Sequence, residues 1–576
     1  MFLEFKNQVE VLIKNAIKDA IKSHSCEIED LNLEPSIHSD IATNVAFRLA
    51  PILKKNPSDI AKDIVNSIEI PTDSFIEKIE AQGPYINIYA KKEYLIETIN
   101  RINEQIHNFG GKFLTGRVII EHTSANPNGP LHVGHIRNSI IGDTLVRIFT
   151  HAGHSVESQY YINDMGRQIA IVSWGISHFN YDYSKENCMN QKSDHMIADI
   201  YIKANKELKE CPEKNEDITK LMNLIEVGEE DTVNKFKQAV DFAIKGIKES
   251  LVRMNIHHDK FVYESDYIRL GLVENVISEL EQCDCIEIDE GATIVNLSKY
   301  GFEKNLVIKR ADGTSLYVTR DLAYHVWKGE NADQMINVLG TDHKLISSQL
   351  DATLKIIGKK TPKIVIFEFV SLPEGSMSTR AGKFIAADEL LDKIENEAYL
   401  EVNKRKGEKS EEEKRKIANI VGIGAVRYDI VKVSPEKSTV FNWESALDFE
   451  KQSAPYIQYS HARACSILKK AKSKGININA YKINPLLIKE DSEIDLIKLM
   501  SRFDYEINKS VKALKPHIIA IYARELADAF NQFYRLVPVI TDDEELSKNR
   551  LVITNCARIV LFNVLKVLGI VAPESM

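Results

Sequence analysis

The sequence predicts an α/β fold in which a domain built on a doubly wound parallel sheet lies between an α+β N-terminal domain and an all-α C-terminal helical bundle. The chain of 576 residues is too long to fold around a single hydrophobic core. Within residues 111–390, short β-branched runs alternate with helical patterns, and polar clusters follow the runs. This alternation is typical of an open parallel sheet with helices on both faces.

Changes of pattern divide the chain into four expected segments. Residues 1–110 combine helical periodicity with a turn that leads into a strand, and residues 391–440 read as a helical connector with a charge-rich middle. Residues 441–576 are helical in pattern and are expected to form the C-terminal bundle. Within the central domain, the stretch near 175–255 is rich in Lys and Glu and poor in aromatic residues, which favours a helical insertion on the surface.

Composition indicates an ordinary globular protein, with 44% hydrophobic and 27% charged residues. The sequence shows no secretory signal and no run of about 18 uninterrupted apolar residues. Its seven cysteines are scattered, and Cys283 and Cys285 lack zinc-finger spacing, so we expect reduced thiols, no structural metal and a cytoplasmic location. The net charge of −9 argues weakly against a nucleic-acid partner, although a basic face can coexist with an acidic remainder.

One strand–loop–helix unit organises the central domain. Arg117–Glu121 contains three consecutive β-branched residues and reads as a short buried strand. The apolar spacing that follows predicts a helix beginning around Pro130 or Leu131. A proline suits the first helical turn, because its missing N–H costs nothing there. A strand, a loop rich in glycine and proline, and a helix form the opening of a nucleotide-binding α/β unit.

The helix start carries two histidines, His132 and His135, which would share one face of the first turn. Unpaired backbone N–H groups and the helix dipole already favour phosphate there. Two imidazole donors would add a site for a polyphosphate whose charge grows during displacement. Gly134 removes a side chain between them and would let a flat base or sugar lie against the backbone.

A bare His-x-x-His is more often a metal ligand pair or a solvated surface. Here it is embedded in a longer pattern, Ala125-Asn126-Pro127-Asn128-Gly129-Pro130-Leu131-His132-Val133-Gly134-His135-Ile136-Arg137-Asn138. This pattern resembles the HIGH signature of class I aminoacyl-tRNA synthetases, in the form found in arginyl-tRNA synthetases. The resemblance extends over nearly the whole chain and implies a Rossmann-like catalytic domain.

A guanidinium substrate carries five donors in a rigid fork, so its pocket needs carboxylates and other acceptors. The expected strand ends offer Glu121, Glu264, Tyr317 and Asp321, the last two where a strand would pass into a helix. Each acidic residue alone is more often a solvated or salt-bridged surface group, but together with a tyrosine they favour a cation pocket. The family resemblance assigns arginine binding to the same four residues and to Ser124 and Asn126.

The loop Ser376–Lys383 stands where class I enzymes carry their second signature, but neither usual lysine is present. Arg380 and Lys383 are the nearby cations able to neutralise pyrophosphate, unless the loop is an ordinary basic surface. The resemblance implies that ATP contacts His132, Gly134 and His135 and four further residues, Gly340, Asp342, Met377 and Ser378. His343 is also expected to contact ATP, although it departs from the family pattern, in which many members carry glutamine at this position.

Two further segments resemble RNA-binding parts of the family. Gln82, Tyr85 and Asn87 match the N-terminal domain that touches the D-loop of tRNA, and a tyrosine beside amides suits stacking on a splayed base. The helix carrying Tyr456, Tyr459 and His461 matches the anticodon-binding domain. The alternatives are a plain structural turn for the first segment and packing between helices for the second.

The resemblance therefore implies ATP-dependent ligation of L-arginine to tRNA(Arg) through an arginyl-adenylate, with Mg²⁺ accompanying ATP and AMP and pyrophosphate released. A monomer without membrane contact is expected. One alternative is a class I synthetase of another specificity, although the carboxylates disfavour apolar substrates and the absence of paired cysteine ligands disfavours the zinc-dependent cysteinyl enzyme. Another alternative is a non-catalytic tRNA-binding paralogue, against which the intact His132, Gly134 and His135 argue.

Overall fold

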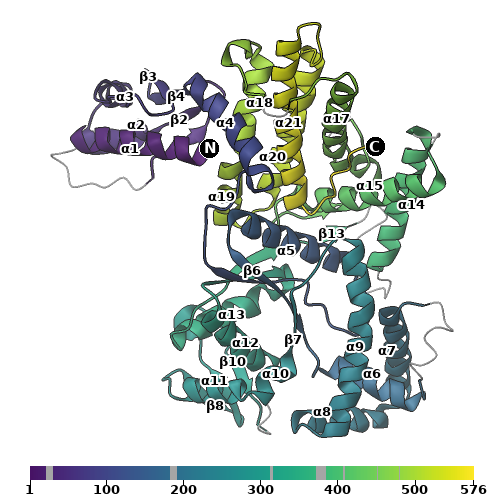
Figure 1. Ribbon diagram of the computed structural model, residues 1–576. Coiled ribbons are helices and arrows are strands. Elements are labelled where there is room, and N and C mark those ends of the chain that lie inside the picture. The colour runs from purple at the N-terminus through teal and green to yellow at the C-terminus, as the bar shows by residue number, and fades with distance from the viewer. Residues whose placement is uncertain are drawn as a thin grey trace.

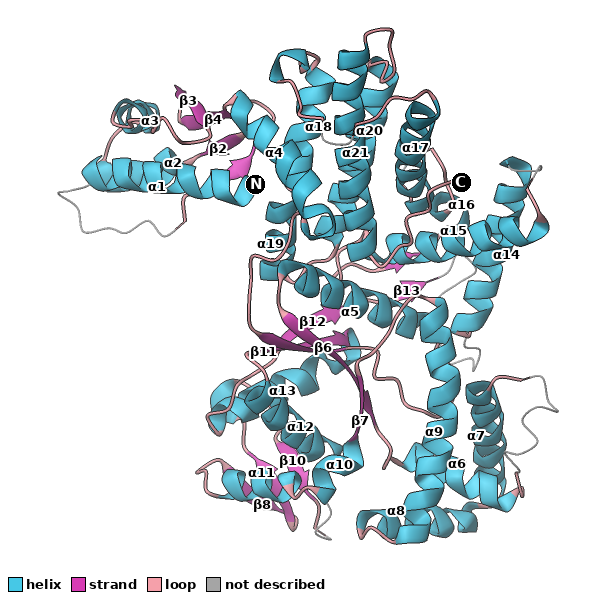
Figure 2. Cartoon of the chain, in the orientation of Figure 1, coloured by secondary structure: helices cyan, strands magenta, loops and turns pink. Residues whose placement is uncertain are grey.

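A computed structural model describes residues 1–20, 30–181, 191–311, 316–371, 385–405, 409–450, 452–478 and 481–576, with side chains from 19 and 20 excepted. The N-terminal unit lies beside the C-terminal helices, and the central sheet lies below both (Figure 1). Strands gather in the central and N-terminal units, whereas the C-terminal part is almost entirely helical (Figure 2). The described structure confirms the predicted fold class.

The N-terminal unit is a four-stranded antiparallel sheet with helices packed against it. The strand order is β1-β2-β4-β3. Its core forms because apolar residues recur every three or four positions along the first helix, where Phe5, Val9 and Ile13 are fully buried. The helices are α1 (Phe2–Ala20), α2 (Val45–Leu53), α3 (Pro57–Asn66) and α4 (Lys92–Gln105), and the strands are β1 (Glu34–Pro35), β2 (Ile41–Thr43), β3 (Ile76–Gln82) and β4 (Tyr85–Ala90).

The central sheet has five parallel strands in the order β12-β11-β5-β6-β7. The chain therefore adds strands first on one side of β5 and later on the other, which places a switch point between β5 and β11. The middle strand is buried on both faces, since Val118, Ile119 and Ile120 are fully inaccessible. The strands are β5 (Arg117–Glu121), β6 (Ser155–Ile162), β7 (Lys260–Tyr263), β11 (Gln334–Gly340) and β12 (Lys363–Phe367).

The long helix after β5 is α5 (Val133–Ala152), so the predicted start at Pro130 or Leu131 is wrong. His132 is the N-cap residue, with an extended backbone (φ −113°, ψ 173°). Leu131 is completely buried before the helix begins, and His132 forms a β-bridge with Ala386. These tertiary contacts keep residues 131 and 132 outside the helix. Apolar spacing alone predicted a longer helix that included Leu131.

The insertion and the region after β7 are mainly helical. The sequence predicted a strand passing into a helix over Ser315–Asp321, of which Ser315 lies outside the described residues. The strand part is wrong for the rest: Leu316 caps a helix that starts at Tyr317, with Val318 and Leu322 buried at helical spacing. The helices are α6 (Arg167–His178), α7 (Ser193–Glu210), α8 (Asn215–Glu226), α9 (Glu230–Arg253), α10 (Glu264–Arg269), α11 (Leu272–Glu281), α12 (Tyr317–Asn331) and α13 (Lys344–Ile356). A small antiparallel sheet comprises β8 (Ile286–Asp289), β9 (Ala292–Val295) and β10 (Leu306–Lys309).

The remaining chain forms a helical hairpin and a bundle above α5 (Figure 1). The hairpin is α14 (Ala387–Arg405) and α15 (Glu411–Val431), and the short strands β13 (Val370–Ser371) and β14 (Thr439–Val440) pair in parallel beside it. The bundle contains α16 (Trp443–Ala446), α17 (Ala454–Ser473), α18 (Asp491–Ser501), α19 (Phe503–Ala513), α20 (His517–Leu536) and α21 (Glu544–Val567). Across the described ranges, no helix has the length and apolar character to cross a membrane.

Candidate active site

The candidate site lies at the carboxyl ends of β5 and β11, on the two sides of the switch point. Parallel pairing sets Glu121, the last residue of β5, in register with Asn337 of β11. The buried Lys328 of α12 reaches both, with its Nζ 2.7 Å from Glu121 Oε2 and 3.0 Å from Asn337 Oδ1. This ion pair neutralises Glu121 inside the protein, where an unpaired charge would be costly.

The loop after β5 has an unusual backbone. Thr123 and Ser124 both have positive φ values, 71° and 40°, and the left-handed region is especially unfavourable for a β-branched residue. Asn138 of α5 accepts the Thr123 N–H at 2.9 Å and donates to the Val338 carbonyl at 3.2 Å. These bonds hold the strained turn against the sheet. Ser124 Oγ consequently lies 3.4 Å from Glu121 Oε1 and accepts the Tyr161 N–H at 3.1 Å.

His132 and His135 stack at the start of α5, with 3.6 Å between ring centroids and 24° between ring planes. His132 Nδ1 accepts the Gly134 N–H at 3.1 Å, and His135 Nδ1 accepts the His132 N–H at 3.3 Å. Burial lowers the pKa of His132, and burial and the neighbouring His132 lower the pKa of His135 to about 3. Both rings are thus neutral near pH 7, and an accepting Nδ1 leaves the ring proton on Nε2 as a donor.

Gly134 makes room for the first of these rings. A Cβ at Gly134 would lie 2.9 Å from Cε1 and 3.1 Å from Nδ1 of His132. The sequence suggested that this glycine admits a base or sugar. In the structure, the nearest atoms to be cleared belong to the His132 imidazole, so any larger residue would push that ring out of its position.

On the other side of the switch point, Tyr317 and Asp321 lie one turn apart on α12 and therefore share a face. Tyr317 is exposed, and the Asp321 side chain is 34% exposed. Asp321 Oδ1 lies 3.0 Å from His325 Nδ1, whose other ring nitrogen accepts the Asn337 amide at 2.6 Å. Burial opposes ionisation of Asp321, but His325 and Lys328 outweigh it and lower the pKa of that carboxyl.

Three residues that the sequence did not single out therefore connect the two predicted carboxylates: Lys328, Asn337 and His325 form a chain of hydrogen bonds from Glu121 to Asp321. A lysine and a histidine within a helix give no signal of such a role. The pairing of Asn337 with Glu121, which brings them together, becomes visible only once the strand register is known.

Glu264, the first residue of α10, is almost fully buried and already binds a guanidinium of the protein. Arg320 Nη1 donates to Glu264 Oε1 at 2.7 Å, and Tyr161 Oη donates to Oε2 at 3.2 Å. Arg320 also pairs with Glu226 at 3.2 Å. Burial raises the pKa of Glu264 to about 7, against the opposing effect of Arg320. Direct contact between Glu264 and a substrate guanidinium stays a prediction.

The predicted ATP contacts after β11 follow a tight turn. Gly340 ends the strand, and a Cβ there would lie 2.6 Å from Asp342 Oδ1. Asp342 and His343 have side chains 66% and 57% exposed, with Asp342 Oδ2 3.6 Å from His343 Nε2. Asn126, in the loop after β5, is also exposed. Met377, Ser378, Arg380 and Lys383 lie outside the described residues.

The predicted RNA contacts of the N-terminal unit occupy the β3–β4 turn. Tyr85 is 49% exposed and meets Phe47, itself 47% exposed, edge to face with 5.8 Å between centroids. Asn87 is buried, and its amide donates to Gln82 Oε1 at 3.1 Å. The exposed aromatic pair, of which Phe47 was not predicted, is accessible to a partner, whereas Asn87 braces the turn from within.

In the C-terminal bundle, Tyr456 and Tyr459 line a cavity of about 820 Å³ together with Arg463, Tyr534 and Arg535. The Arg463 guanidinium lies over both Tyr459 and Tyr534, 4.7 and 5.0 Å from the ring centroids. His461 does not line this cavity. It is buried, and its Nδ1 lies 2.9 Å from the carbonyl oxygen of Pro573, in the segment that follows α21.

The site thus combines neutral imidazole donors at a helix start, a partly exposed carboxylate, and two carboxylates closed by internal cations. Such a set can stabilise charge on a phosphate and bind a cationic side chain. In the part of the chain that the structure describes, no group of three or more His, Cys, Asp or Glu residues is arranged to hold a metal ion.

Comparisons with known proteins agree along the whole chain. Residues 110–443 match the family model "tRNA synthetases class I (R), catalytic domain", residues 457–576 match "DALR anticodon binding domain", and residues 7–90 match "Arginyl tRNA synthetase N terminal domain". The arginine–tRNA ligase of Methanococcoides burtonii is 58% identical over 577 residues, and that of Methanosarcina barkeri is 56% identical over 579 residues; both alignments cover 100% of each chain. The solved arginyl-tRNA synthetase of Thermus thermophilus is 26% identical with a TM-score of 0.83, over 98% of this chain and 99% of that one.

Proposed function

This chain belongs to the arginyl-tRNA synthetase family, and on that premise we propose how its residues ligate L-arginine to tRNA(Arg). In the first step the arginine carboxylate attacks the α-phosphate of ATP, forming arginyl-adenylate as pyrophosphate leaves. In the second step a hydroxyl of the terminal ribose of the tRNA attacks the acyl carbon, and AMP leaves. The observation that carries the proposal is the stacked His132–His135 pair at the opening of α5, beside the carboxylates of the switch point.

His132 and His135 are assigned to the phosphates of ATP. Each accepts a backbone N–H through Nδ1, so each would present Nε2–H to oxygen atoms that gain charge during displacement. Fixed donors need no reorganisation when that charge appears, and the positive end of the helix dipole adds to them. The chemistry then depends chiefly on position and charge, without a covalent intermediate on the protein.

Arginine is assigned to the region between the β5 loop and α12. The partly exposed Asp321 is the proposed ionic partner of the guanidinium, with Tyr317 on the same helical face. Ser124 and Asn126, with Glu121 behind them, are proposed to hold the α-amino and carboxylate end. Glu264 would act from a second layer through Tyr161 and Arg320, because its carboxylate is already bound.

Transfer RNA is assigned to two aromatic surfaces. Tyr85, with Phe47, is proposed to stack on a splayed base of the D-loop, while Gln82 and Asn87 hold that turn in shape. Tyr456 and Tyr459 line the bundle cavity, where tyrosine rings and the Arg463 guanidinium over Tyr459 suit an unstacked anticodon base. His461 would contribute by fixing the segment around Pro573 beside this cavity.

The accompanying proposals concern ligands and organisation. ATP would bind through Gly340, Asp342 and His343 as well as the two histidines, and Met377, Ser378, Arg380 and Lys383 are proposed to meet its phosphates. Mg²⁺ is proposed to come with ATP, held largely by phosphate and water. The proposed units are 1–110, 111–390, 391–440 and 441–576, acting as a cytoplasmic monomer.

Aminoacylation assays with total tRNA and each of the twenty amino acids test the function. Arginine should be the one efficient substrate, and His132→Ala should abolish most of the activity without loss of folding. Efficient charging of a different amino acid would support the alternative of another class I specificity. Binding of tRNA without charging of any amino acid would support a non-catalytic paralogue.

A further inference from the structure

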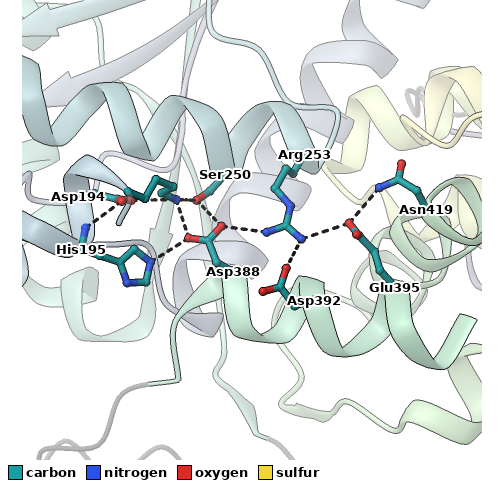
Figure 3. Close-up of polar contacts among 9 residues, drawn as sticks. Asp194, His195, Ser250, Arg253, Asp388, Asp392, Glu395 and Asn419 are labelled. Carbon is teal, nitrogen blue, oxygen red and sulfur yellow. Dashed lines mark hydrogen bonds and ion pairs between the residues drawn. The ribbon is translucent and has the colours of Figure 1, made fainter. Parts of the chain in front are cut away.

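A polar cluster joins the insertion to the first turn of α14 (Figure 3). Asp388 is its centre and receives four donors from two other helices or their ends. Lys192 Nζ lies 2.5 Å from Oδ2 and His195 Nε2 lies 3.1 Å from it, while Ser250 Oγ donates to Oδ1 at 3.0 Å and Arg253 Nη1 at 3.3 Å. We call these five residues the Asp388 cluster.

The contacts of Asp388 connect two parts of the protein and lie mostly inside it, because the Asp388 side chain is only 14% exposed. Burial opposes ionisation of Asp388, but hydrogen bonds from His195 and Lys192 overcome it and hold the pKa of the carboxyl well below its usual range. The same contact raises the pKa of His195. Charge-assisted bonds that are partly shielded from water are the strong ones, in contrast to exposed surface pairs.

On the insertion side, the residues of the Asp388 cluster are held by close packing of α7 against α9. Asp194 is fully buried beside Lys192, with 3.1 Å between the charged atoms. The start of α7 lies directly on Gly246 of α9, where a Cβ would come within 2.5 Å of Asp194 Oδ1. Since the two helices approach so closely, Lys192, His195, Ser250 and Arg253 form one framework rather than separate surface groups.

On the α14 side, backbone contacts connect the Asp388 cluster to the proposed phosphate site. Two residues before Asp388, Ala386 forms a β-bridge with His132, and the Ala387 N–H donates to the Leu131 carbonyl at 2.7 Å. Leu131 and His132 directly precede α5, and the backbone of His132 is extended. Whatever fixes the first turn of α14 therefore fixes the backbone that carries the His132 ring.

We propose that Asp388 is a positioning residue for arginine activation: it anchors the start of α14 to the insertion and, through Ala386 and Ala387, sets the position of His132 at the phosphate site. The inference rests on the proposed function and adds a role for the insertion. Small displacements of a catalytic donor reduce rates strongly. Asp388 lies two residues after Ala386, which pairs with His132, so a shift of Asp388 should lower the rate of activation.

The chain offers a matched control one helical turn away. Asp392 pairs with Arg253 at 2.6 Å, as Asp388 does at a longer distance, but its side chain is 65% exposed. Figure 3 draws a contact between Asp392 and Arg253 and none between Asp392 and His195. Asp392→Asn removes the same charge from the same helix and one partner of Arg253, but it leaves the bonds of Asp388 with Lys192, His195 and Ser250 in place.

The test measures ATP–pyrophosphate exchange with saturating arginine and tRNA in the full-length protein. Asp388→Asn should lower kcat about tenfold with little change in the KM for ATP, and Asp392→Asn should behave as the unmodified enzyme. Thermal unfolding of each variant is measured in parallel. If Asp388→Asn does not fold, Lys192→Gln removes one donor of the cluster and should lower kcat in the same sense.

A double-mutant cycle with His132→Ala separates positioning from general damage. If Asp388 acts through His132, its substitution should cost little once the His132 ring is gone, so the two effects should be clearly less than multiplicative. Multiplicative effects, or equal activities of Asp388→Asn and Asp392→Asn, would overturn the inference. Lack of arginine-dependent exchange in the unmodified enzyme would instead contradict the proposed function.

Discussion

At the level of single residues, the acidic groups of the candidate site are of two kinds, which differ in exposure and in their partners. Glu121 and Glu264 have side chains only 9% and 2% exposed, and each holds a cation of the protein. Asp321 faces a histidine and keeps a third of its side chain exposed. A substrate guanidinium can therefore reach Asp321 without displacing a lysine or an arginine.

Asp321→Asn should lower kcat/KM for arginine, because the variant keeps the shape of the side chain but loses the charge-assisted bond. The expected loss is about 2–4 kcal/mol in transition-state stabilisation, with the KM for ATP nearly unchanged. Citrulline, the neutral isostere, should be a very poor substrate of the unmodified enzyme. Steady-state aminoacylation with both compounds measures this, and full arginine efficiency in Asp321→Asn would refute the pocket assignment.

His135 allows donor and acceptor functions to be separated by two substitutions. Truncation to Ala should lower kcat by roughly a hundred- to thousandfold, more than it raises the KM for ATP. Gln places a donor near the position of Nε2, whereas Asn places an acceptor near that of Nδ1, so His135→Gln should retain more activity than His135→Asn. Single-turnover activation with tRNA bound reports on the chemical step, and the reverse order of the two variants would assign His135 to holding the His132 backbone.

Among the elements, α5 is held in place by an arginine of the signature itself. Arg137 is fully buried and donates to five backbone carbonyls, which lie in the two segments that lead into β13 and β14. Those carbonyls belong to Glu368, Phe369, Ser434, Pro435 and Lys437. The guanidinium thus fastens the helix that carries His135 to the segments that precede β13 and β14.

Arg137→Lys should destabilise the protein, although it conserves the charge. An ammonium is a point donor and cannot serve five acceptors spread over two segments, so a loss of about 2–4 kcal/mol is expected. A fall in the midpoint of thermal unfolding checks this. Arg167→Lys is the control, since Arg167 is exposed and donates to Asn215 at 2.6 Å; equal midpoints for the two variants would show that the five bonds contribute little.

Local pattern predicted elements well where tertiary contacts agree with it, as in Arg117–Glu121. It failed at Leu131, which lies before the helix and accepts a hydrogen bond from Ala387. It also failed at Tyr317, where β-branched neighbours suggested a strand but Leu316 caps a helix with buried residues at helical spacing. The signature histidines could be found because their spacing is local. Lys328 and Arg320 could not, because their partners come from strands and helices far away in sequence.

At the scale of the whole molecule, three units meet around α5. The buried Arg427 of α15 forms an ion pair with Asp143 of α5 and donates to the carbonyls of Met254 and Leu568, at 2.8 and 2.9 Å. Gly569 leaves room for this guanidinium, since a Cβ there would lie 2.0 Å from Nη2. The end of the insertion, helix α5 and the segment after α21 are therefore connected by one side chain.

Acid should loosen a second junction, formed by His151 of α5 with Phe109 and Phe503. Burial lowers the pKa of His151 to about 4, below its unfolded value near 6.5. Between those values the unfolded chain binds more protons, so stability falls as pH drops below about 6.5, by about 2 kcal/mol for this group at pH 5. His151→Gln can still donate to the Phe109 carbonyl but does not titrate.

Thermal unfolding at pH 7 and pH 5 measures that effect. The unmodified protein should lose more stability between the two conditions than His151→Gln does. Equal losses would mean that His151 is not protonated on unfolding in this range, and a larger loss in the variant would contradict the assigned direction of its pKa shift.

The contact between the first and last units also imposes an order on biosynthesis. Tyr94 of α4 bonds to Ser501 at 2.7 Å, across 407 positions of sequence, and Phe2 packs on Tyr505 with ring centroids 5.2 Å apart. At about 5–20 residues per second, the ribosome needs on the order of tens of seconds to deliver those partners. During that interval the apolar face of the N-terminal unit lacks its partner surface, so the nascent chain should depend on chaperones most strongly before the bundle emerges.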